Sequence, residues 1–282
     1  MTTTPHTLRL GAATITILNA GDMLVNMAEE MNLPANFQSS YTDLLQPAPF
    51  PSQSIHIALQ DASILVDIND YAHAVPPDSP FAIPGYQPPP SIVEQLQSLN
   101  IQPEDITYVI ITHAHFDHYS GTTFEEAGRR VPRFPNATYY LGKADWEHPD
   151  IQQGILESGS LEGQTLGVLH NLGRLKPVEG DLNLLPGVQI IAAPGESPGH
   201  QLVRVHSQGQ TLYCVGDLFH HPIEIEHPSL MAQWADPQTN LNSRQKFIKA
   251  AIAENAIIVA AHMTPGRISG TPTSPHYEPL EW

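Results

Sequence analysis

Short apolar runs separated by turn residues dominate the hydrophobic pattern of the chain. Most of these runs show the β-branched enrichment or the two-residue alternation that is typical of β-strands. The clearest helical spacing covers residues 243–255, with an apolar stripe of Phe247, Ile248, Ala251 and Ile252. The pattern predicts strands at residues 8–18, 54–59, 63–66, 106–112, 138–141, 188–193, 201–206 and 211–215.

Further helices are predicted from the spacing of Ile92, Leu96 and Leu99 and over residues 118–130. Asn242 or Ser243 is predicted to cap the last helix. No Gly/Ser linker or charge run separates the strands and helices into independent parts. We therefore expect a single domain of the α+β class over residues 1–282.

One segment, residues 69–90, is rich in proline and also carries Asp and aromatic residues. Proline restricts the backbone, so this composition predicts a rigid loop. Phe81 and Tyr86 in this loop are candidates for contacting a substrate.

The composition narrows the classes of partner. The formal net charge is −17 with only 12 Lys and Arg residues, so phosphate backbones and anionic lipids are unfavourable partners. Cys214 is the single cysteine and lies in an apolar run, which indicates a small buried residue and a reducing compartment. Without a secretory pattern at the start or a long apolar run, we expect a cytoplasmic protein that binds neither nucleic acid nor membranes.

The strongest chemical signal is the segment Tyr108-Val-Ile-Ile-Thr-His-Ala-His-Phe-Asp-His118. An apolar strand ends here in three imidazoles and a carboxylate. His113 and His115 point to the same side of an extended chain and can hold one ion together. Asp117 and His118, where the chain turns, can face a second ion. Imidazole and carboxylate are the usual ligands of zinc and similar divalent ions.

Three more candidate ligands share one setting, next to an apolar strand. His200 follows a Pro/Gly turn, Asp217 comes just after a strand, and His262 ends an apolar run that starts at residue 256. Each alone is a weak signal. Together they indicate a site that is assembled at one edge of a sheet.

The order His-x-His-x-Asp-His, then His, Asp and His, resembles the metallo-beta-lactamase superfamily over roughly residues 55–263. The resemblance implies a four-layer αββα sandwich with two metal ions at one edge of its sheets. It also implies that Asp67 supports the metal-binding loop. The implied ligands are His113, His115 and His200 for one ion, Asp117, His118 and His262 for the other, and Asp217 as the bridge.

Asp217 and His115 select a branch of this superfamily. Antibiotic-cleaving members lack the bridging Asp, and oxygen-reducing diiron members replace the second His of the motif with an acid. The segments 139–146 and 215–222 look most similar to the quorum-quenching lactonase and methyl-parathion-hydrolase group. The resemblance thus implies two divalent ions, with zinc preferred over iron, manganese or cobalt.

The function that this implies is hydrolysis of a small neutral ester, lactone or phosphoester by a hydroxide that bridges the metals. Asp117 is the candidate catalytic residue, because its carboxylate can pass a proton to the leaving oxygen. His220 and His221 are expected to line the pocket or a surface turn rather than bind metal. Two alternatives stay open, a mononuclear iron-dependent dioxygenase or oxidoreductase of the same fold and a non-catalytic metal-binding protein. The sequence also leaves a homodimer open.

Overall fold

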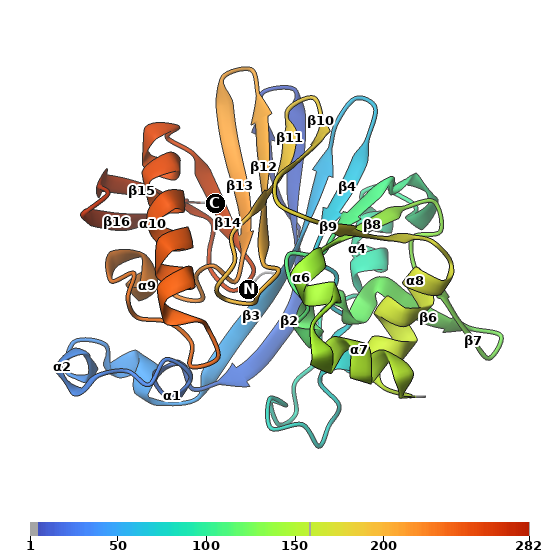
Figure 1. Ribbon diagram of the computed structural model, residues 1–282, viewed down its shortest axis with the longest axis horizontal. Helices are drawn as coiled ribbons and strands as arrows, with labels where there is room; N and C mark the ends of the chain where they lie inside the picture. Colours follow the sequence, from blue (N-terminus) through green and yellow to red (C-terminus); the bar gives the residue numbers. More distant parts are fainter. Residues whose placement is uncertain (1–4, 158, 282) are drawn as a thin grey trace.

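Two seven-stranded sheets lie at the centre of the computed structural model, which describes residues 5–157 and 159–281 (Figure 1). The first sheet has the order β1-β2-β3-β4-β5-β8-β9, and the second runs from β10 to β16 in sequence order. The strands of the first sheet are β1 (His6–Leu10), β2 (Ala13–Val25), β3 (Ala48–Ala58), β4 (Ser63–Val66), β5 (Tyr108–Ile110), β8 (Thr138–Gly142) and β9 (Leu175–Val178).

The second sheet uses the later half of the chain. Its strands are β10 (Leu182–Leu185), β11 (Val188–Ala192), β12 (Gln201–Ser207), β13 (Gln210–Gly216), β14 (Ile257–Ala260), β15 (Gly266–Thr271) and β16 (Ser274–Pro279). A separate hairpin is formed by β6 (Thr123–Glu126) and β7 (Arg129–Pro132).

Helices cover the outer face of each sheet. The α-helices are α1 (Met27–Glu30), α2 (Ala35–Gln38), α3 (Tyr71–Ala74), α4 (Ile92–Ser98), α5 (Phe116–Tyr119), α6 (Lys143–Trp146), α7 (Pro149–Leu156), α8 (Val168–Asn171), α9 (Pro222–Glu226) and α10 (Pro237–Ala253). The 3₁₀ turns are η1 (Thr42–Leu45), η2 (Pro103–Asp105) and η3 (Ser120–Thr122), and η4 (Gly163–Gly167) is a π-helical turn. Apolar residues of α4, α7 and α8 pack on the first sheet, and those of α10 pack on the second. The predicted αββα sandwich is confirmed.

The inner faces of the two sheets share one apolar core. Ile15 and Ile57 from the first sheet pack with Val203, Cys214 and Val259 from the second, and all five are almost fully buried. Burying apolar side chains between the sheets is the main driving force for this arrangement. The expectation that Cys214 is a small buried residue is confirmed.

Parallel pairing brings the candidate ligands to one edge. In the first sheet β4, β5 and β8 are parallel, and in the second β13 and β14 are parallel. The carboxyl ends of parallel strands meet at the same edge, where polar residues can leave the core. Asp67, His113 and Asp145 follow β4, β5 and β8, while Asp217 and His262 follow β13 and β14.

Two predicted elements differ from the structure. The strand over residues 8–18 is a hairpin of β1 and β2, which turns at Gly11 with a φ of 58°. The prediction of a helix over residues 118–130 is wrong, because α5 ends at Tyr119 and the β6–β7 hairpin follows. Its turn uses Ala127 and Gly128 with φ values of 50° and 76°, a left-handed conformation that interrupts any helix.

The cap predicted for the last helix is also wrong. Helix α10 begins at Pro237, and the side chain of Asp236 accepts a hydrogen bond from the Thr239 N–H at 2.8 Å. Ser243 lies inside the helix and donates to the Pro194 carbonyl at 2.6 Å. Pro237 at the first position of the helix needs no hydrogen-bond partner, which favours this earlier start.

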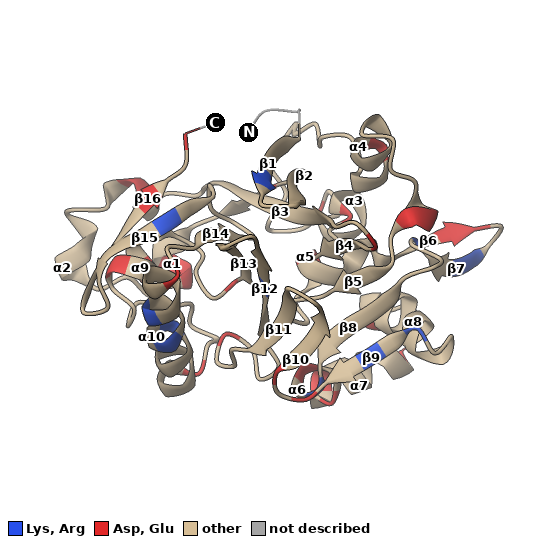
Figure 2. Cartoon of the chain, turned by 90° about the horizontal axis from the view of Figure 1, so that it is seen from above, with Lys and Arg blue, Asp and Glu red and all other residues tan. Residues whose placement is uncertain are grey.

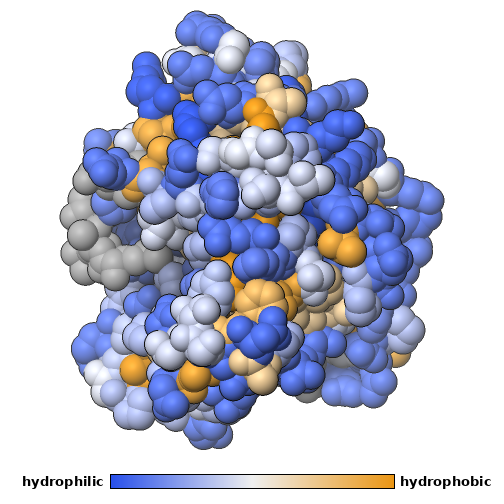
Figure 3. Space-filling view, turned by 90° about the vertical axis from the view of Figure 1, so that its left-hand side faces the viewer, coloured by the Kyte–Doolittle hydropathy of each residue, from blue (hydrophilic) through white to orange (hydrophobic). Residues whose placement is uncertain are grey.

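The acidic excess is spread over the surface. In Figure 2 the Asp and Glu residues lie mainly on helices and loops, and the fewer basic residues include those of β1, β7, β9, α10 and β15. On the face seen in Figure 3, hydrophilic residues predominate and hydrophobic ones form small patches. Over residues 5–157 and 159–281, no helix combines the length and apolar character of a membrane-crossing segment.

A buried ion pair holds the segment that follows Asp217. The Arg244 guanidinium donates to Glu224 at 2.6 Å and to the Leu218 carbonyl at 2.8 Å, and both charged side chains are fully buried. We expect Arg244→Met to lower the free energy of unfolding by about 3–5 kcal/mol, because Glu224 stays buried without its guanidinium partner. Chemical denaturation measures this loss.

Arg204→Met is the matched control, since Arg204 forms a partly exposed ion pair with Glu254 at 3.1 Å. Solvent screens this pair, so the control should lose less than about 1 kcal/mol. Equal losses in the two variants would contradict the role given to the buried pair.

Candidate metal centre

Six of the seven predicted metal ligands converge where the edges of the two sheets meet. Glu196, an acid that the sequence analysis missed, lies among them. The donor atoms form two compact groups, each within 4.8 Å. The first ligand group consists of His113, His115, Glu196 and Asp217. The second ligand group consists of Asp117, His118 and His262.

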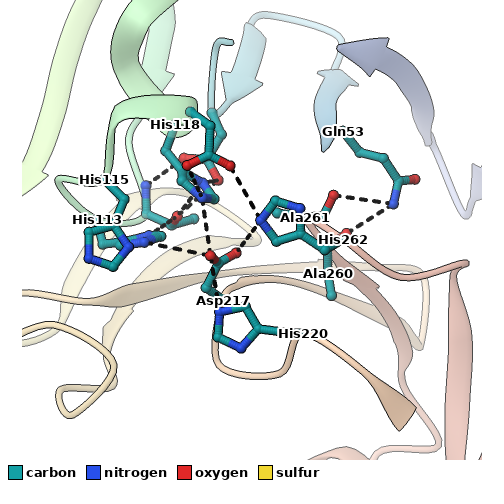
Figure 4. Close-up of polar contacts among 12 residues, drawn as sticks. Gln53, His113, His115, His118, Asp217, His220, Ala260, Ala261 and His262 are labelled. Atoms are coloured by element: carbon teal, nitrogen blue, oxygen red, sulfur yellow. Dashed lines mark hydrogen bonds and ion pairs between the residues drawn. The ribbon is translucent and has the colours of Figure 1, made fainter. Parts of the chain in front are cut away.

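Asp217 belongs to the first ligand group and also faces the histidines of the second. Its Oδ2 atom is 3.7 Å from His113 Nε2 and 3.3 Å from His118 Nε2, and its Oδ1 atom is 3.2 Å from His262 Nε2. Figure 4 shows these imidazoles around the carboxylate, together with His220. The structure thus gives Asp217 the position that a bridging ligand needs.

The second ligand group closes around the same carboxylate. Asp117 Oδ1 is 3.6 Å from His118 Nε2, and Asp117 Oδ2 is 3.4 Å from His262 Nε2. All three side chains of the group are buried. Two imidazoles and a carboxylate at these separations suit a divalent ion with further positions for Asp217 and water.

The chemistry of the donors fits a cation. His113 Nε2, His118 Nε2 and Asp217 Oδ1 are buried atoms that lack a hydrogen-bond partner. Buried polar atoms are rarely left without partners, because desolvation is costly. Here the lone pairs point toward one another, an arrangement that a positive ion would satisfy.

Asp67 supports this loop as the resemblance implies. Its carboxylate accepts from the Thr112 N–H at 2.7 Å and the Thr112 hydroxyl at 2.8 Å. It also faces His118 Nδ1 at 3.0 Å. A carboxylate behind a histidine fixes the ring and keeps its other nitrogen directed at the metal.

The ring of His262 is fixed in a similar way by β3. Its Nδ1 donates to the Pro51 carbonyl at 2.6 Å, and the Phe50 ring stacks on it with a centroid distance of 4.1 Å. Gln53 strengthens the junction between the sheets by donating to the carbonyls of Ala260 and Met263 at 3.2 and 2.7 Å (Figure 4 shows Gln53 and Ala260). His262 Nε2 is therefore left free to face Asp217.

His200 lies beside the first ligand group but outside it. Its Nε2 accepts a hydrogen bond from the Asp217 N–H at 3.2 Å, and its Nδ1 is 3.2 Å from the Ala193 carbonyl. The His200 and His113 ring centroids are 5.2 Å apart. That His200 binds the first ion stays a prediction.

The sequence analysis did not identify Glu196. It is 2% exposed and faces His113 and His115, in the loop from Ala193 to His200. The signal that was available is an acid within a Pro/Gly turn four residues before a candidate ligand. Such acids are common in solvated loops, so only the tertiary structure distinguishes this one.

Asp145 is a second missed residue, and it joins the two loops that carry the ligands. Its carboxylate accepts from the Ala114 N–H at 2.9 Å, from the Ser197 hydroxyl at 2.8 Å and from the Gly199 N–H at 2.5 Å. Ala114 lies between the first two motif histidines. Asp145 therefore fixes the distance between the motif and the Glu196 loop.

Two buried groups show the electrostatic character of the site. Burial disfavours the charged form of His118, but the carboxylates of Asp217 and Asp117 raise its pKa well above the ordinary value. Burial also opposes ionisation of Asp217, yet His118 and His262 hold its pKa well below the ordinary value. The site therefore concentrates negative charge that attracts protons or a metal cation.

His220 lies in the pocket wall, which is one of the two locations predicted for it. It is 4% exposed, with Nε2 at 3.3 Å from Asp217 Oδ2 and Nδ1 at 3.4 Å from Glu224 Oε2. His221 instead caps α9, since its Nδ1 accepts from the Ile223 N–H at 3.2 Å. That neither histidine binds metal stays a prediction.

A largely apolar pocket of about 230 Å³ opens onto the ligands. Its floor contains His115, Asp117, Asp217 and His262. Its walls come from Met23, Val25, Met27, Phe50, Phe81, Phe116, Ala232 and Trp234, with Glu30 and His220 as polar members. The pocket places an apolar surface directly beside the candidate metal ligands.

Phe81 and Tyr86, the candidate substrate contacts of the 69–90 loop, have different positions. Phe81 lines the pocket and stacks on Phe116 with a centroid distance of 5.8 Å. The Tyr86 hydroxyl instead donates to Asp22 Oδ2 at 2.8 Å and accepts from the Asp22 N–H. Tyr86 therefore anchors the loop to β2, and Phe81 is its pocket residue.

The family model described as "Metallo-beta-lactamase superfamily" matches residues 84–262, more than half of the chain. The chain therefore belongs to the metallo-beta-lactamase superfamily. An N-acyl homoserine lactonase from Bacillus cereus is 28% identical over 173 residues, which is 61% of each chain. A second one, from Azorhizobium caulinodans, is 28% identical over 183 residues, 60% of this chain and 63% of the relative. The matches thus span less than two thirds of these curated relatives.

Solved structures share the fold over nearly the whole chain. The hydrolase AbOPH of the beta-lactamase superfamily is 19% identical, covers 100% of this chain and 99% of its own, and has a TM-score of 0.79. The dizinc quorum-quenching lactonase AidC, solved with N-hexanoyl-L-homoserine, is 19% identical with a TM-score of 0.78 and coverages of 99% and 98%. At this identity the likeness concerns the fold.

We expect Asp67→Asn to weaken binding of the ion at the second ligand group by about 10- to 100-fold and that of the first ion less, because Asp67 reaches His113 only through Thr112. The amide preserves the shape of Asp67 but removes the charge that orients His118. Calorimetric titration of the metal-free protein with Zn²⁺ measures both affinities. Unchanged binding of both ions would contradict the supporting role of Asp67.

Proposed function

We propose that the chain is a dinuclear metal-dependent hydrolase that cleaves a small neutral ester or lactone with an apolar acyl group. The observation that carries this proposal is the apolar pocket whose floor contains Asp117, Asp217 and His262. A pocket with apolar walls and a few convergent polar groups is typical of a small-molecule site. The similarity to N-acyl homoserine lactonases supports the same substrate class.

Two bound divalent ions would polarise the substrate carbonyl and lower the pKa of a water molecule toward neutrality. The donors of both ligand groups suit zinc, iron, manganese or cobalt, and we propose zinc. The second ligand group is complete and buried, which supports two ions over the mononuclear alternative.

Asp117 is the proposed proton carrier. It lines the pocket as well as the second ligand group, so its carboxylate reaches both the ligands and a substrate. In ester hydrolysis the attacking water loses a proton and the leaving oxygen gains one. A carboxylate at this position can accept the proton from the water and then pass it to the leaving oxygen. His220 lines the same pocket, and its Nε2 faces Asp217 Oδ2 at 3.3 Å.

The charge of the protein favours a neutral substrate. The net charge is −17, and the pocket also contains Glu30, which belongs to neither ligand group. An anionic substrate such as a phosphodiester would be repelled by this field. We therefore place lactones and aryl esters before charged phosphoesters, with neutral phosphotriesters as the remaining phosphorus substrates.

The proposal predicts about two metal ions per chain and ester or lactone turnover that depends on them. Asp217→Ala should lose kcat/KM by orders of magnitude and remain folded, because one substitution removes the ligand between both groups. Elemental analysis and turnover of lactones, aryl esters and phosphotriesters measure this. His221→Ala is the control that should keep both ions. Full activity with one ion would contradict the dinuclear proposal.

The pocket wall predicts a preference for longer acyl groups. Each extra methylene buried against the wall strengthens binding by at most about 0.8 kcal/mol. We expect Phe81→Ala to flatten the rise of kcat/KM with acyl length, while Phe124→Ala, which removes a ring of the β6–β7 hairpin outside the pocket, leaves it unchanged. A wild-type enzyme that is insensitive to acyl length would place the acyl site elsewhere.

A further inference from the structure

The loop between β11 and β12 brings an acid to the first ligand group. Glu196 Oε2 is 3.4 Å from His113 Nε2, and Glu196 Oε1 is 3.3 Å from His115 Nδ1. Bonds of about 2.0–2.1 Å around a tetrahedral ion separate the ligand atoms by about 3.4 Å. The spacing of this carboxylate from two histidines is therefore that of atoms sharing one ion.

The hydrogen bonds around His113 show why its contact with Glu196 needs a cation. The Thr112 hydroxyl gives its hydrogen to Asp67 at 2.8 Å, so it can only accept from His113 Nδ1, 3.1 Å away. The Nδ1 proton leaves Nε2 with a lone pair. That lone pair faces Glu196 Oε2, and neither atom has a hydrogen-bond partner.

Glu196 is also held in place from behind. The Trp234 Nε1–H donates to Glu196 Oε1 at 2.7 Å, which orients the carboxylate. The preceding Gly195 has a φ of 130°, and a Cβ there would lie 2.2 Å from the Asn240 backbone nitrogen in α10. This close packing leaves the loop little freedom to carry Glu196 away from the histidines.

We propose that Glu196 is a direct ligand of the ion held by His113 and His115. Glu196 is not among the seven ligands that the sequence resemblance implies. Glu196, Asp117 and the shared Asp217 then supply three negative charges against the four positive charges of two divalent ions in a buried site. Because Trp234 also lines the apolar pocket, this ligand connects the first ion to the pocket wall. The inference rests on the proposed function only in requiring ions at this site.

The test compares Glu196→Gln with Glu147→Gln, the same change at an exposed glutamate on the surface. Each protein is stripped of metal, checked for folding by circular dichroism and titrated with Zn²⁺ by calorimetry. Losing a group behind a ligand already costs about 10- to 100-fold in affinity. Loss of a direct ligand should thus weaken one of the two ions by roughly tenfold or more and leave the other unchanged.

The visible spectrum of Co²⁺-substituted protein gives a second readout, because it reports the ligands and geometry of the ion. We expect Glu196→Gln to change this spectrum and Glu147→Gln to preserve it. Trp234→Phe keeps an aromatic side chain but removes the hydrogen bond to Glu196, so it should weaken binding of the same ion by a smaller factor. Wild-type Zn²⁺ affinities and an unchanged Co²⁺ spectrum in Glu196→Gln would overturn the assignment.

A crystal structure of the Zn²⁺-loaded wild type gives an answer that does not depend on how the variant folds. A Glu196 carboxylate bound to the ion supports the inference, and one turned away overturns it. Two bound ions without ester or lactone turnover would sink the proposed function and leave the ligand assignment intact. Ester or lactone turnover by the wild type, with unaltered metal binding in Glu196→Gln, would overturn the ligand assignment and leave the proposed function intact.

Discussion

The arrangement of the candidate metal centre depends on the buried carboxylate of Asp217, which four imidazoles surround. Asp217 is 3% exposed, and His113, His118, His220 and His262 all approach its oxygens. Moving a carboxylate out of water costs several kcal/mol unless nearby groups compensate for the lost hydration. Here the compensation comes from both sheets, since β5 leads to two of the imidazoles and the second sheet supplies the other two. The edges of the sandwich must therefore meet at this point.

The supporting residues show how the edges are held at this distance. Asp67 fixes the motif loop through Thr112, and Asp145 joins that loop to the Glu196 loop. In α9, which follows β13 of the second sheet, Glu224 accepts from the His220 N–H and pairs with the buried Arg244. Each support is a charged group that is itself satisfied by hydrogen bonds. Satisfied polar networks of this kind rigidify a site and keep its ligands ready for an ion.

The pocket connects this polar edge to an apolar wall. The wall is built from the long β2–β3 hairpin, the 69–90 loop and the segment that carries Trp234. These parts lie far apart in the sequence, and the loop is fixed to β2 by the Leu24 N–H, which donates to the Phe81 carbonyl at 2.8 Å. A preformed wall lowers the entropy cost of ordering the pocket around an apolar group. Shape and chemistry together thus favour one class of substrate.

The sequence by itself predicted the αββα class through the resemblance. It also singled out the four polar residues of the motif, Asp217 and His262 as candidate ligands, because apolar strands ending in His and Asp are local signals. It also indicated Asp67 behind the motif through the resemblance. Local patterns failed at residues 118–130, where the left-handed turn at Ala127 and Gly128 outweighs the helical spacing. Only the tertiary structure distinguished Glu196 from a solvated loop acid and Phe81 from Tyr86. Those distinctions depend on contacts between segments far apart in the chain, which no local pattern of residues encodes.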